Sequence, residues 1–133
     1  MDWKFVKPLV DENTIKEFEE KISRTLPDSL KKDIIEHNGG RPKSWIFNTN
    51  KGGNRMFKGL LSFNKEDSNN IFQALEWDIG PDNQDDYVII GQDPFGNYIC
   101  MDKDLEEMVF INKNSFVVEY IADNYSEFIE KLH

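Results

Sequence analysis

The apolar residues near the start of the chain recur at the spacing of an α-helix. Ile15, Phe18 and Ile22 lie three or four positions apart, which places them on one helical face. Asn13 or Thr14 can cap the start of this helix with a side-chain oxygen. The pattern therefore predicts an amphipathic helix that begins near residue 13 and ends before the next Leu-Pro pair.

That Leu-Pro pair is well placed to begin a second helix. Pro27 lacks the N–H group that stays unbonded in a first helical turn, so it fits there without losing a hydrogen bond. Leu30 and Ile34, assisted by Ile35, supply the apolar face of this helix. The segment Asn38-Gly39-Gly40 contains glycines that can take the left-handed conformation, so the helix should end there.

After residue 44 the apolar residues form short runs that are typical of β-strands. We expect strands at 45–47 and 55–63, the second interrupted by Gly59, with a turn or mobile loop at 51–54. The segment Asp93–Asn97 combines proline and glycine in an order that favours a tight turn. The strands that follow residue 86 are expected to pair as two hairpins, 87–90 with 98–101 and 108–111 with 116–120.

Two further helices are expected. Asn69 or Asn70 caps a short helix that carries Ile71, Phe72 and Leu75 towards the core. The last helix begins near residue 123, and its apolar face consists of Phe128, Ile129 and Leu132. The predicted class is therefore α+β, with N-terminal helices, a mostly antiparallel β-sheet and a C-terminal helix packed on it.

Length and composition support a folded protein. The chain has 133 residues, which suits a single domain covering 1–133. Its hydrophobic content of 38% and aromatic content of 13% exceed those of disordered chains, so we expect an ordered core. The lone Cys100 excludes an internal disulfide and favours a reducing cytoplasm. We expect neither a signal peptide nor a membrane span, because the first residues carry scattered charges and no run approaches about 18 apolar residues.

Charge is distributed unevenly along the chain. The net charge is −9, from 16 basic and 25 acidic side chains. Residues 1–64 hold 12 basic and 9 acidic side chains, a net charge of +3, whereas residues 65–133 hold 4 and 16, a net charge of −12. A chain of this kind is a poor nucleic-acid binder, because it lacks the basic stripe that supplies affinity for phosphates. It suits a basic protein partner, although solubility alone also explains such a charge.

Two acidic clusters are the candidate binding residues. The first contains Asp82, Asp85 and Asp86, and the second contains Asp102, Asp104, Glu106 and Glu107. The second cluster begins like a calcium loop of the EF-hand type, but Glu107 stands where the turning glycine is needed. We therefore expect no metal site. The clusters form either a solvated acidic loop or, in the sharper interpretation, an acidic contact surface.

Signs of catalysis are weak. His37 lies at the expected end of the second helix, His133 is the last residue, and neither has a ligand or catalytic partner at a suitable spacing. Cys100 lies in an apolar strand where nothing lowers its pKa. The two Gly-Gly pairs lack the spacing of phosphate-binding loops. We expect no enzymatic activity and no cofactor.

Three segments together carry a family resemblance. They are Leu26-Pro27-Asp28-Ser29-Leu30-Lys31, then Asn38-Gly39-Gly40, and later Ile90–Asp102 with its Asp-x-x-Gly-Asn turn. Their order and spacing resemble those of the SUKH superfamily, which contains bacterial toxin-immunity proteins and the fungal Smi/Knr cell-wall regulators. The resemblance covers nearly the whole chain.

The resemblance implies one SUKH-like α+β domain without an active site. It implies a cytoplasmic immunity protein that binds and neutralises a cognate toxin, often a nuclease, through direct contact. A regulatory protein–protein interaction module whose partner is not a toxin remains the alternative. The motif residues Pro27, Gly39 and Gly96 are expected to serve backbone geometry, so the resemblance assigns no binding residues. The expected partner is thus a basic protein, with neither nucleic acid nor a membrane as a ligand.

Overall fold

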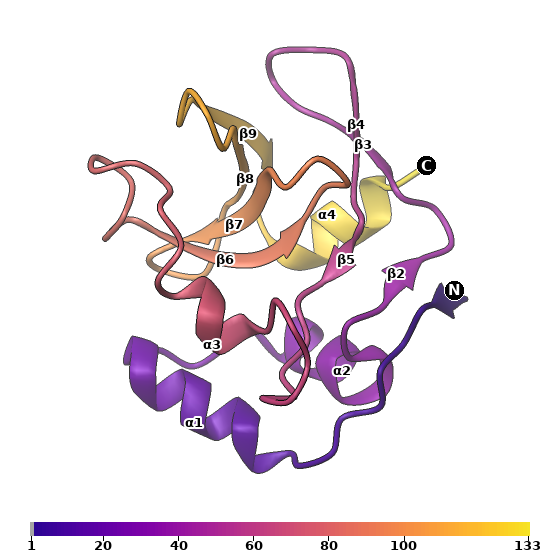
Figure 1. Ribbon diagram of the computed structural model, residues 1–133. Helices are drawn as coiled ribbons and strands as arrows, with labels where there is room; N and C mark the ends of the chain where they lie inside the picture. The colour runs from indigo at the N-terminus through magenta and orange to yellow at the C-terminus, as the bar shows by residue number, and fades with distance from the viewer. Residues whose placement is uncertain (1) are drawn as a thin grey trace.

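A five-stranded antiparallel sheet forms the centre of the molecule (Figure 1). The computed structural model describes residues 2–133 and confirms the predicted α+β class, with helices first and a helix after the last strand. The strands follow the order β5-β6-β7-β8-β9. Their bounds are β5 (Gly59–Leu60), β6 (Tyr87–Gln92), β7 (Tyr98–Asp102), β8 (Met108–Ile111) and β9 (Val118–Ala122). Both predicted hairpins are present, although β9 begins at Val118 and not at residue 116.

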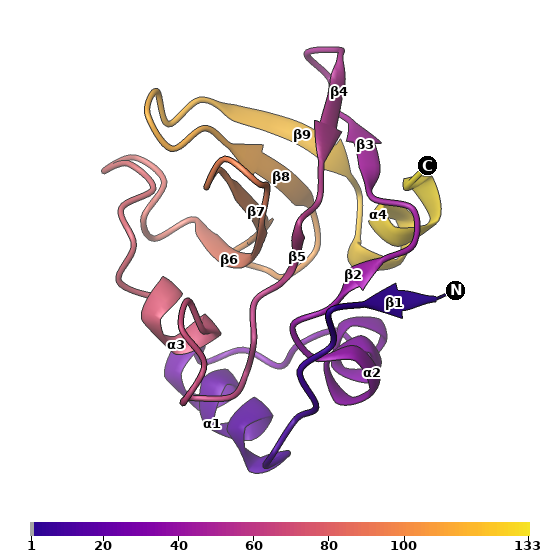
Figure 2. The ribbon, with the colours of Figure 1, turned by 45° about the vertical axis from the view of Figure 1, so that its right-hand side comes forward.

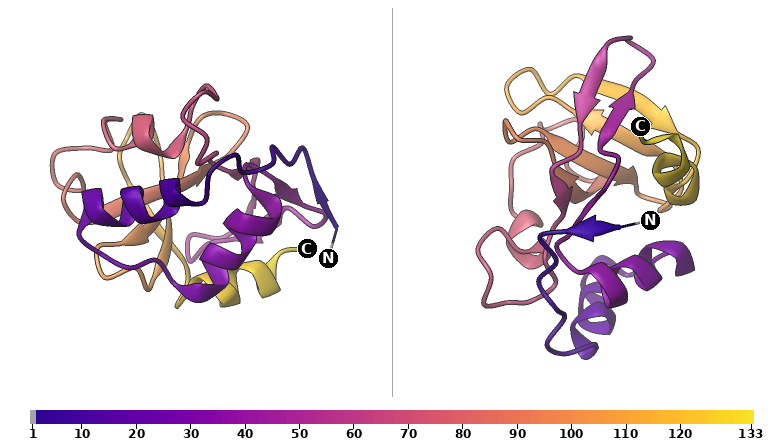
Figure 3. Two further views of the ribbon diagram at one scale, coloured as in Figure 1. Left: turned by 90° about the horizontal axis from the view of Figure 1, so that it is seen from below. Right: turned by 90° about the vertical axis from the view of Figure 1, so that its right-hand side faces the viewer.

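Residues 2–133 form four helices, and α1 and α2 lie together on one side of the molecule (Figure 3). Their bounds are α1 (Asn13–Ile22), α2 (Asp28–His37), α3 (Ile71–Ala74) and α4 (Tyr125–Lys131). The predicted inner residues Leu30 and Ile34 are buried, but Ile35 is 47% exposed. Leu75 follows α3 and is 37% exposed, so its predicted core position is also wrong. Both side chains lie beyond the narrow stripe of each helix that contacts the core.

Local capping explains two of the helix boundaries. Asn70 caps α3, as one of the two predicted alternatives. Its side-chain oxygen accepts the N–H of Gln73, and the side-chain carbonyl of Gln73 accepts the N–H of Asn70. At α1 the predicted cap is wrong, because the carboxylate of Asp11 accepts the N–H of Asn13 at 2.9 Å. Helix α1 ends at Ser23, which takes the left-handed conformation, before the Leu-Pro pair is reached.

Two small sheets accompany the central one. In the first, β1 (Trp3–Lys4) pairs with β2 (Arg41–Pro42), a contact too short to be visible in the sequence (Figure 2). In the second, β3 (Ile46–Asn48) pairs with β4 (Asn54–Met56). The predicted strand 55–63 is therefore divided between β4 and β5. Gly59 permits the change of direction, because a Cβ there would lie 2.8 Å from the carbonyl oxygen of Gly40.

The core contains two clusters of aromatic rings. Phe18 of α1 meets Phe63 edge-on, with the ring centroids 5.4 Å apart. Phe128 of α4 meets Phe47 and Phe57 in the same manner, at 5.6 and 5.1 Å. Such edge-to-face pairs add to the free energy gained by burying the rings. The first cluster attaches α1 to the centre of the molecule, and the second fixes the closing helix against the β3–β4 region.

The buried side chain of Asn38, in the Asn-Gly-Gly motif, connects three parts of the chain by hydrogen bonds. The side-chain amide of Asn38 donates to the carbonyl of Lys7 at 2.8 Å and to the hydroxyl of Ser62 at 3.0 Å. Its carbonyl oxygen accepts the N–H of Phe63 at 2.8 Å. Gly39 follows with a φ of +70°, which lets the chain turn away from α2. Three distant segments are thus held together by one buried side chain.

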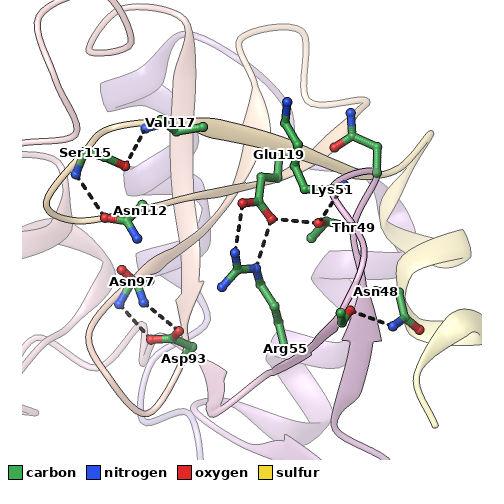
Figure 4. A network of polar contacts seen from close by, with 12 residues as sticks. Asn48, Thr49, Lys51, Arg55, Asp93, Asn97, Asn112, Ser115, Val117 and Glu119 are labelled. Carbon is green, nitrogen blue, oxygen red and sulfur yellow. Dashed lines mark hydrogen bonds and ion pairs between the residues drawn. The ribbon is translucent and has the colours of Figure 1, made fainter.

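The Asp-x-x-Gly-Asn motif joins the two hairpins (Figure 4). The carboxylate of Asp93 accepts the N–H groups of Phe95 and Asn97 at 2.9 and 2.7 Å. The side-chain carbonyl of Asn97 accepts the N–H of Lys113, which lies in the turn between β8 and β9, at 2.9 Å. Asp93 and Asn97 are both buried. The motif therefore has a structural role, as its turn chemistry predicts.

Replacing Gly96 tests this turn. Gly96 has a φ of +86°, and a Cβ there would meet only the Lys113 side chain, at 3.5 Å or more. The cost of substitution is therefore conformational and not steric. We expect Gly96→Val to lower the free energy of unfolding by at least about 1 kcal/mol, and Gly96→Asn by clearly less, because Asn tolerates this region. Urea unfolding of both variants measures the difference, and equal stability of wild type and Gly96→Val would contradict the expectation.

Candidate partner-binding surface

One residue of the first acidic cluster meets the second cluster at one end of the β6–β7 hairpin. Tyr87 pairs with Asp102 at the open end of the hairpin, so the loop before β6 and the loop after β7 leave the sheet side by side (Figure 1). Lys103 Nζ lies 3.9 Å from the carboxylate of Asp86, which connects the two loops. Asp86 therefore belongs with the second cluster. We call the set Asp86, Asp102, Asp104, Glu106 and Glu107 the acidic surface.

Tyrosine residues report the electrostatic field of this surface. Burial raises the pKa of the half-buried Tyr87, and the charges of Asp86, Glu107 and Asp102 raise it further. Glu107 also lies close enough to Tyr120 of β9 to act on it. The pKa of Tyr120 rises to about 12, mainly through its hydrogen bond to Asp123, with Glu107 contributing.

One predicted binding residue has a structural role. The carboxylate of Asp102 accepts the backbone N–H groups of Asp104 at 3.1 Å, Glu106 at 3.0 Å and Glu107 at 3.3 Å. These bonds hold the loop in a fixed shape and occupy the oxygens of Asp102. Asp104, Glu106 and Glu107 are exposed, so their charges face solvent. Asp102 therefore fixes the shape of the loop, and the loop holds the carboxylates of Asp104, Glu106 and Glu107 in solvent.

The first cluster is only partly joined to the acidic surface. Asp82 and Asp85 are exposed, and among residues 2–133 no ion pair or hydrogen bond joins either side chain to the second cluster. The neighbouring Asn83 donates to the carbonyls of Ile79 and Phe116, both at 2.9 Å, which fixes the loop against the β8–β9 turn. The carboxylates of this loop are therefore held by a rigid backbone, but they do not form one compact group.

A small groove with both polar and apolar lining residues adjoins Asp85. Its volume is about 290 Å³, and it lies between the end of α1, the end of α3 and the start of β6. Ile22, Leu75 and Val88 supply apolar lining, with Asp85 and Tyr87 at the same site. Sequence patterns do not reveal this feature, because Ile22 and Leu75 fall on the faces predicted to be core. The partial exposure of Leu75 is what identifies it.

The other candidate reactive groups are occupied or inaccessible. Burial raises the pKa of the Cys100 thiol, which keeps it protonated and shielded. The His37 ring stacks on Trp3 at 4.8 Å, and a His133 ring nitrogen lies 2.9 Å from the Asn48 side-chain oxygen. Residues 2–133 contain no group of three or more His, Cys, Asp or Glu side chains able to hold a metal ion. None of the helices described is long and apolar enough to cross a membrane.

Comparison with known proteins identifies the family. The sequence model of the SMI1 / KNR4 family (SUKH-1) matches residues 9–131. A search of curated proteins found no match. The family match covers the helices, the central sheet and all three motif segments, which agrees with the resemblance noted in the sequence. The chain therefore belongs to the SMI1 / KNR4 family, SUKH-1.

Proposed function

We propose that this protein is an immunity protein, which binds a cognate toxin domain in the cytoplasm of the producing bacterial cell and blocks its activity. Family membership supports the proposal, since the SUKH superfamily resembled by this chain contains toxin-immunity proteins. The motif residues also support it indirectly. Asn38, Asp93 and Asn97 are committed to internal hydrogen bonds, so they act in the scaffold and leave binding to the surface.

The chemistry of the surface favours a basic partner, and among toxins a nuclease. Nucleases present positive charge to phosphate groups, and the acidic surface offers the opposite potential. The single observation that carries this part of the proposal is the convergence of Asp86 with the 102–107 loop at one end of the β6–β7 hairpin. Asp86 and the 102–107 loop are separated in sequence, but they lie next to each other in the fold.

The adjoining groove gives this region the composition of a binding interface. Stable interfaces combine an apolar centre with a polar rim. Here Leu75, Val88 and the ring of Tyr87 supply the apolar part. Asp85 and Lys21 supply the charged part of the groove, next to the acidic surface. A basic partner that inserts an apolar side chain would bury the groove while its Lys or Arg side chains meet the rim.

Co-purification with the product of the adjacent gene tests the proposal. The toxin domain is produced with its catalytic site inactivated, mixed with this protein and passed over a sizing column. The active toxin is then assayed for nucleic-acid cleavage with increasing amounts of this protein. We expect a stable complex and loss of cleavage near equal molar amounts. A complex without inhibition, or no complex at all, would contradict the immunity function.

A regulatory interaction module is the second candidate. The matching family model is that of SMI1 and KNR4, and the superfamily resembled by this chain also contains the Smi/Knr cell-wall regulators. The two candidates differ in the partner and not in the scaffold. An adjacent gene whose product is unrelated to toxins, yet binds the acidic surface, would favour the regulatory module.

A further inference from the structure

A groove at the opposite end of β6 has the opposite charge. Its volume is about 460 Å³, and the charged residues that line it are Lys7, Arg41 and Lys58, with no carboxylate among the lining residues. Phe5 and Gln92 lie at the same groove. In a chain of net charge −9, three cations without an acid in one concave site are unexpected. We call this site the basic groove.

Two aromatic rings hold Arg41 in place, but one of its N–H donors has no hydrogen-bond partner. Its guanidinium carbon lies 4.8 Å from the centre of the Phe5 ring and 4.3 Å from that of Trp45, so two aromatic rings restrict its position. Its Nε is buried, and within residues 2–133 it has no hydrogen-bond acceptor. Buried donors without a partner are rare, because they lose water without replacing it. The side chain is thus a preorganised cation whose hydrogen-bonding capacity is unused.

The two lysines are also available. Within the described chain neither Lys7 nor Lys58 has a carboxylate within 4.0 Å. The hydrogen bond from Ser62 is the main cause that lowers the pKa of Asp67, and the charge of Lys7 contributes to the same shift. One oxygen of Asp67 accepts from Ser62 at 2.6 Å and from Asn64 at 3.3 Å. Asp67 therefore lies beside the groove, bonded to its lining residue Ser62, and forms no ion pair with Lys7 within 4.0 Å.

The backbone around the groove is strained. Phe5 and Asn69 both line it, and both have positive φ values, +60° and +56°. The conformation is costly for an aromatic residue, and such residues cluster at functional sites. Phe5 is also 68% exposed, so burial of its ring does not offset this cost. The exposed Phe5 ring lies over the Arg41 guanidinium at the groove.

We propose that the basic groove binds an extended protein segment in which acidic side chains alternate with apolar ones. Carboxylates would pair with Arg41, Lys7 and Lys58, and the apolar side chains would lie on the exposed ring of Phe5. In an extended segment alternate side chains point to opposite faces, so its carboxylates and its apolar groups would contact different parts of the groove. A long polyanion such as nucleic acid is disfavoured, because it would extend into the field of the acidic half of the chain.

The basic groove is separate from the acidic surface. Gln92 lies at the groove and Tyr87 at the acidic surface, at the two ends of β6, about 17 Å apart for a strand of this length. Figure 1 shows β5 and β2, which border the groove, beside the end of β6 and away from its start. The proposal is therefore independent of the toxin hypothesis, and each fails or succeeds without the other.

A titration with a short peptide of alternating Glu and Leu tests the proposal, with a peptide of alternating Gln and Leu as control. The full chain is used at low salt, and binding is followed by calorimetry and by amide chemical shifts. We expect the Glu peptide to bind and shift the amides of Gly39, Arg41 and Gly59, and the Gln peptide not to bind. Lys7→Glu combined with Lys58→Glu should weaken the affinity about tenfold or more, since each cation then becomes a like charge.

A charge-matched variant controls for net charge. Lys16→Glu combined with Lys32→Glu changes two exposed lysines outside the groove and should leave the affinity within about twofold. Melting temperatures of both double variants verify that they are folded. No binding of the Glu peptide, or equal weakening in both double variants, would overturn the proposal. Stronger binding of single-stranded DNA or of inorganic phosphate, with displacement of the peptide, would also overturn it.

Discussion

Replacing Glu119 by Gln should lower the free energy of unfolding by roughly 2 kcal/mol, because it removes the charge from a nearly buried ion pair. Glu119 of β9 is 8% exposed. Its carboxylate accepts hydrogen bonds from Nε and Nη2 of Arg55 on β4, at 2.9 and 2.8 Å (Figure 4). It accepts a third from the hydroxyl of Thr49 at 2.6 Å. The Arg55 guanidinium also lies 4.0 Å from the centre of the Phe110 ring. Without the carboxylate, Arg55 would remain partly buried and unpaired.

This ion pair fixes the β3–β4 hairpin to the edge of the sheet. Asn50 adds two hydrogen bonds to this contact. Its backbone N–H donates to the carbonyl of Tyr120 at 2.9 Å, and its side-chain carbonyl accepts the N–H of Tyr120 at 2.9 Å. The edge of β9 is thereby covered, which protects an unpaired strand from association with other chains. Loss of the pair should therefore loosen the hairpin as well as destabilise the fold.

An exposed ion pair provides the matched control. Glu17 pairs with Lys65, and the two side chains are 42% and 53% exposed. Exposed pairs contribute little, so Glu17→Gln should change the free energy of unfolding by less than about 0.5 kcal/mol. Urea unfolding at neutral pH compares the two variants. Equal effects of Glu119→Gln and Glu17→Gln would show that the buried pair contributes no more than a surface pair.

The same pair gives a pH dependence. Burial alone would raise the pKa of Glu119, but the hydrogen bonds from Arg55 and Thr49 outweigh it and lower the pKa below its ordinary value of 4.5. A carboxylate with a lowered pKa stabilises the folded state above its unfolded value and loses this contribution as pH falls. The stability difference between wild type and Glu119→Gln should therefore narrow below about pH 4.5. A constant difference down to strongly acid pH would contradict the assignment.

Local sequence signals predicted the elements of this fold but not the contacts between them. The 87–90 and 98–101 runs, with their Asp-Pro-Phe-Gly-Asn turn, predicted β6 and β7 because strand pattern and turn chemistry agree. The pairing of β1 with β2 joins residues nearly forty positions apart through two-residue strands. Such strands carry no periodicity, so no local signal could reveal them. Ile35 and Leu75 were misplaced because spacing gives a helical face but not how much of it a neighbour covers.

For the candidate site too, the sequence predicted the residues but not the contacts between them. Composition identified the acidic clusters, and the register of Tyr87 with Asp102 brings Asp86 to the second of them. The sequence could not show that Asp102 is occupied by three backbone N–H groups, since this depends on the path of the loop. It likewise could not show the basic groove, because Lys7, Arg41 and Lys58 come from three separate segments. The net charge of +3 for residues 1–64 agrees with a basic site but does not show where its cations come together.

Neutralising the acidic loops should slow association with a basic toxin about tenfold or more at low salt, because opposite potentials steer the encounter of two proteins. Two variants test the two loops separately. The first carries Asp82→Asn, Asp85→Asn and Asp86→Asn, and the second carries Asp104→Asn, Glu106→Gln and Glu107→Gln. Asp102 is left unchanged in both, because its carboxylate holds the second loop. The second variant should have the larger effect, since its three carboxylates lie together on one loop.

The control variant removes the same number of charges elsewhere. Glu12→Gln, Glu66→Gln and Glu130→Gln change three exposed residues outside the acidic surface. Association and dissociation rates are measured by stopped-flow mixing with the catalytically inactive toxin domain over a range of salt concentrations. The difference between the acidic-loop variants and the control should shrink as salt rises, because the screening length falls from about 30 Å at 0.01 M to about 8 Å at 0.15 M.

The two rate constants distinguish steering from anchoring. Charges at the rim of an interface act mainly on association, whereas a carboxylate buried against Lys or Arg of the partner acts on dissociation and contributes about 2–5 kcal/mol. Exposure of Asp104, Glu106 and Glu107 in the free protein favours the first outcome. Faster dissociation in the second variant would instead place its carboxylates inside the interface, beside the groove at Tyr87 and Val88. Wild-type kinetics in both variants at low salt would make the acidic loops a solubility feature, and the toxin would then have to bind another surface of the same scaffold.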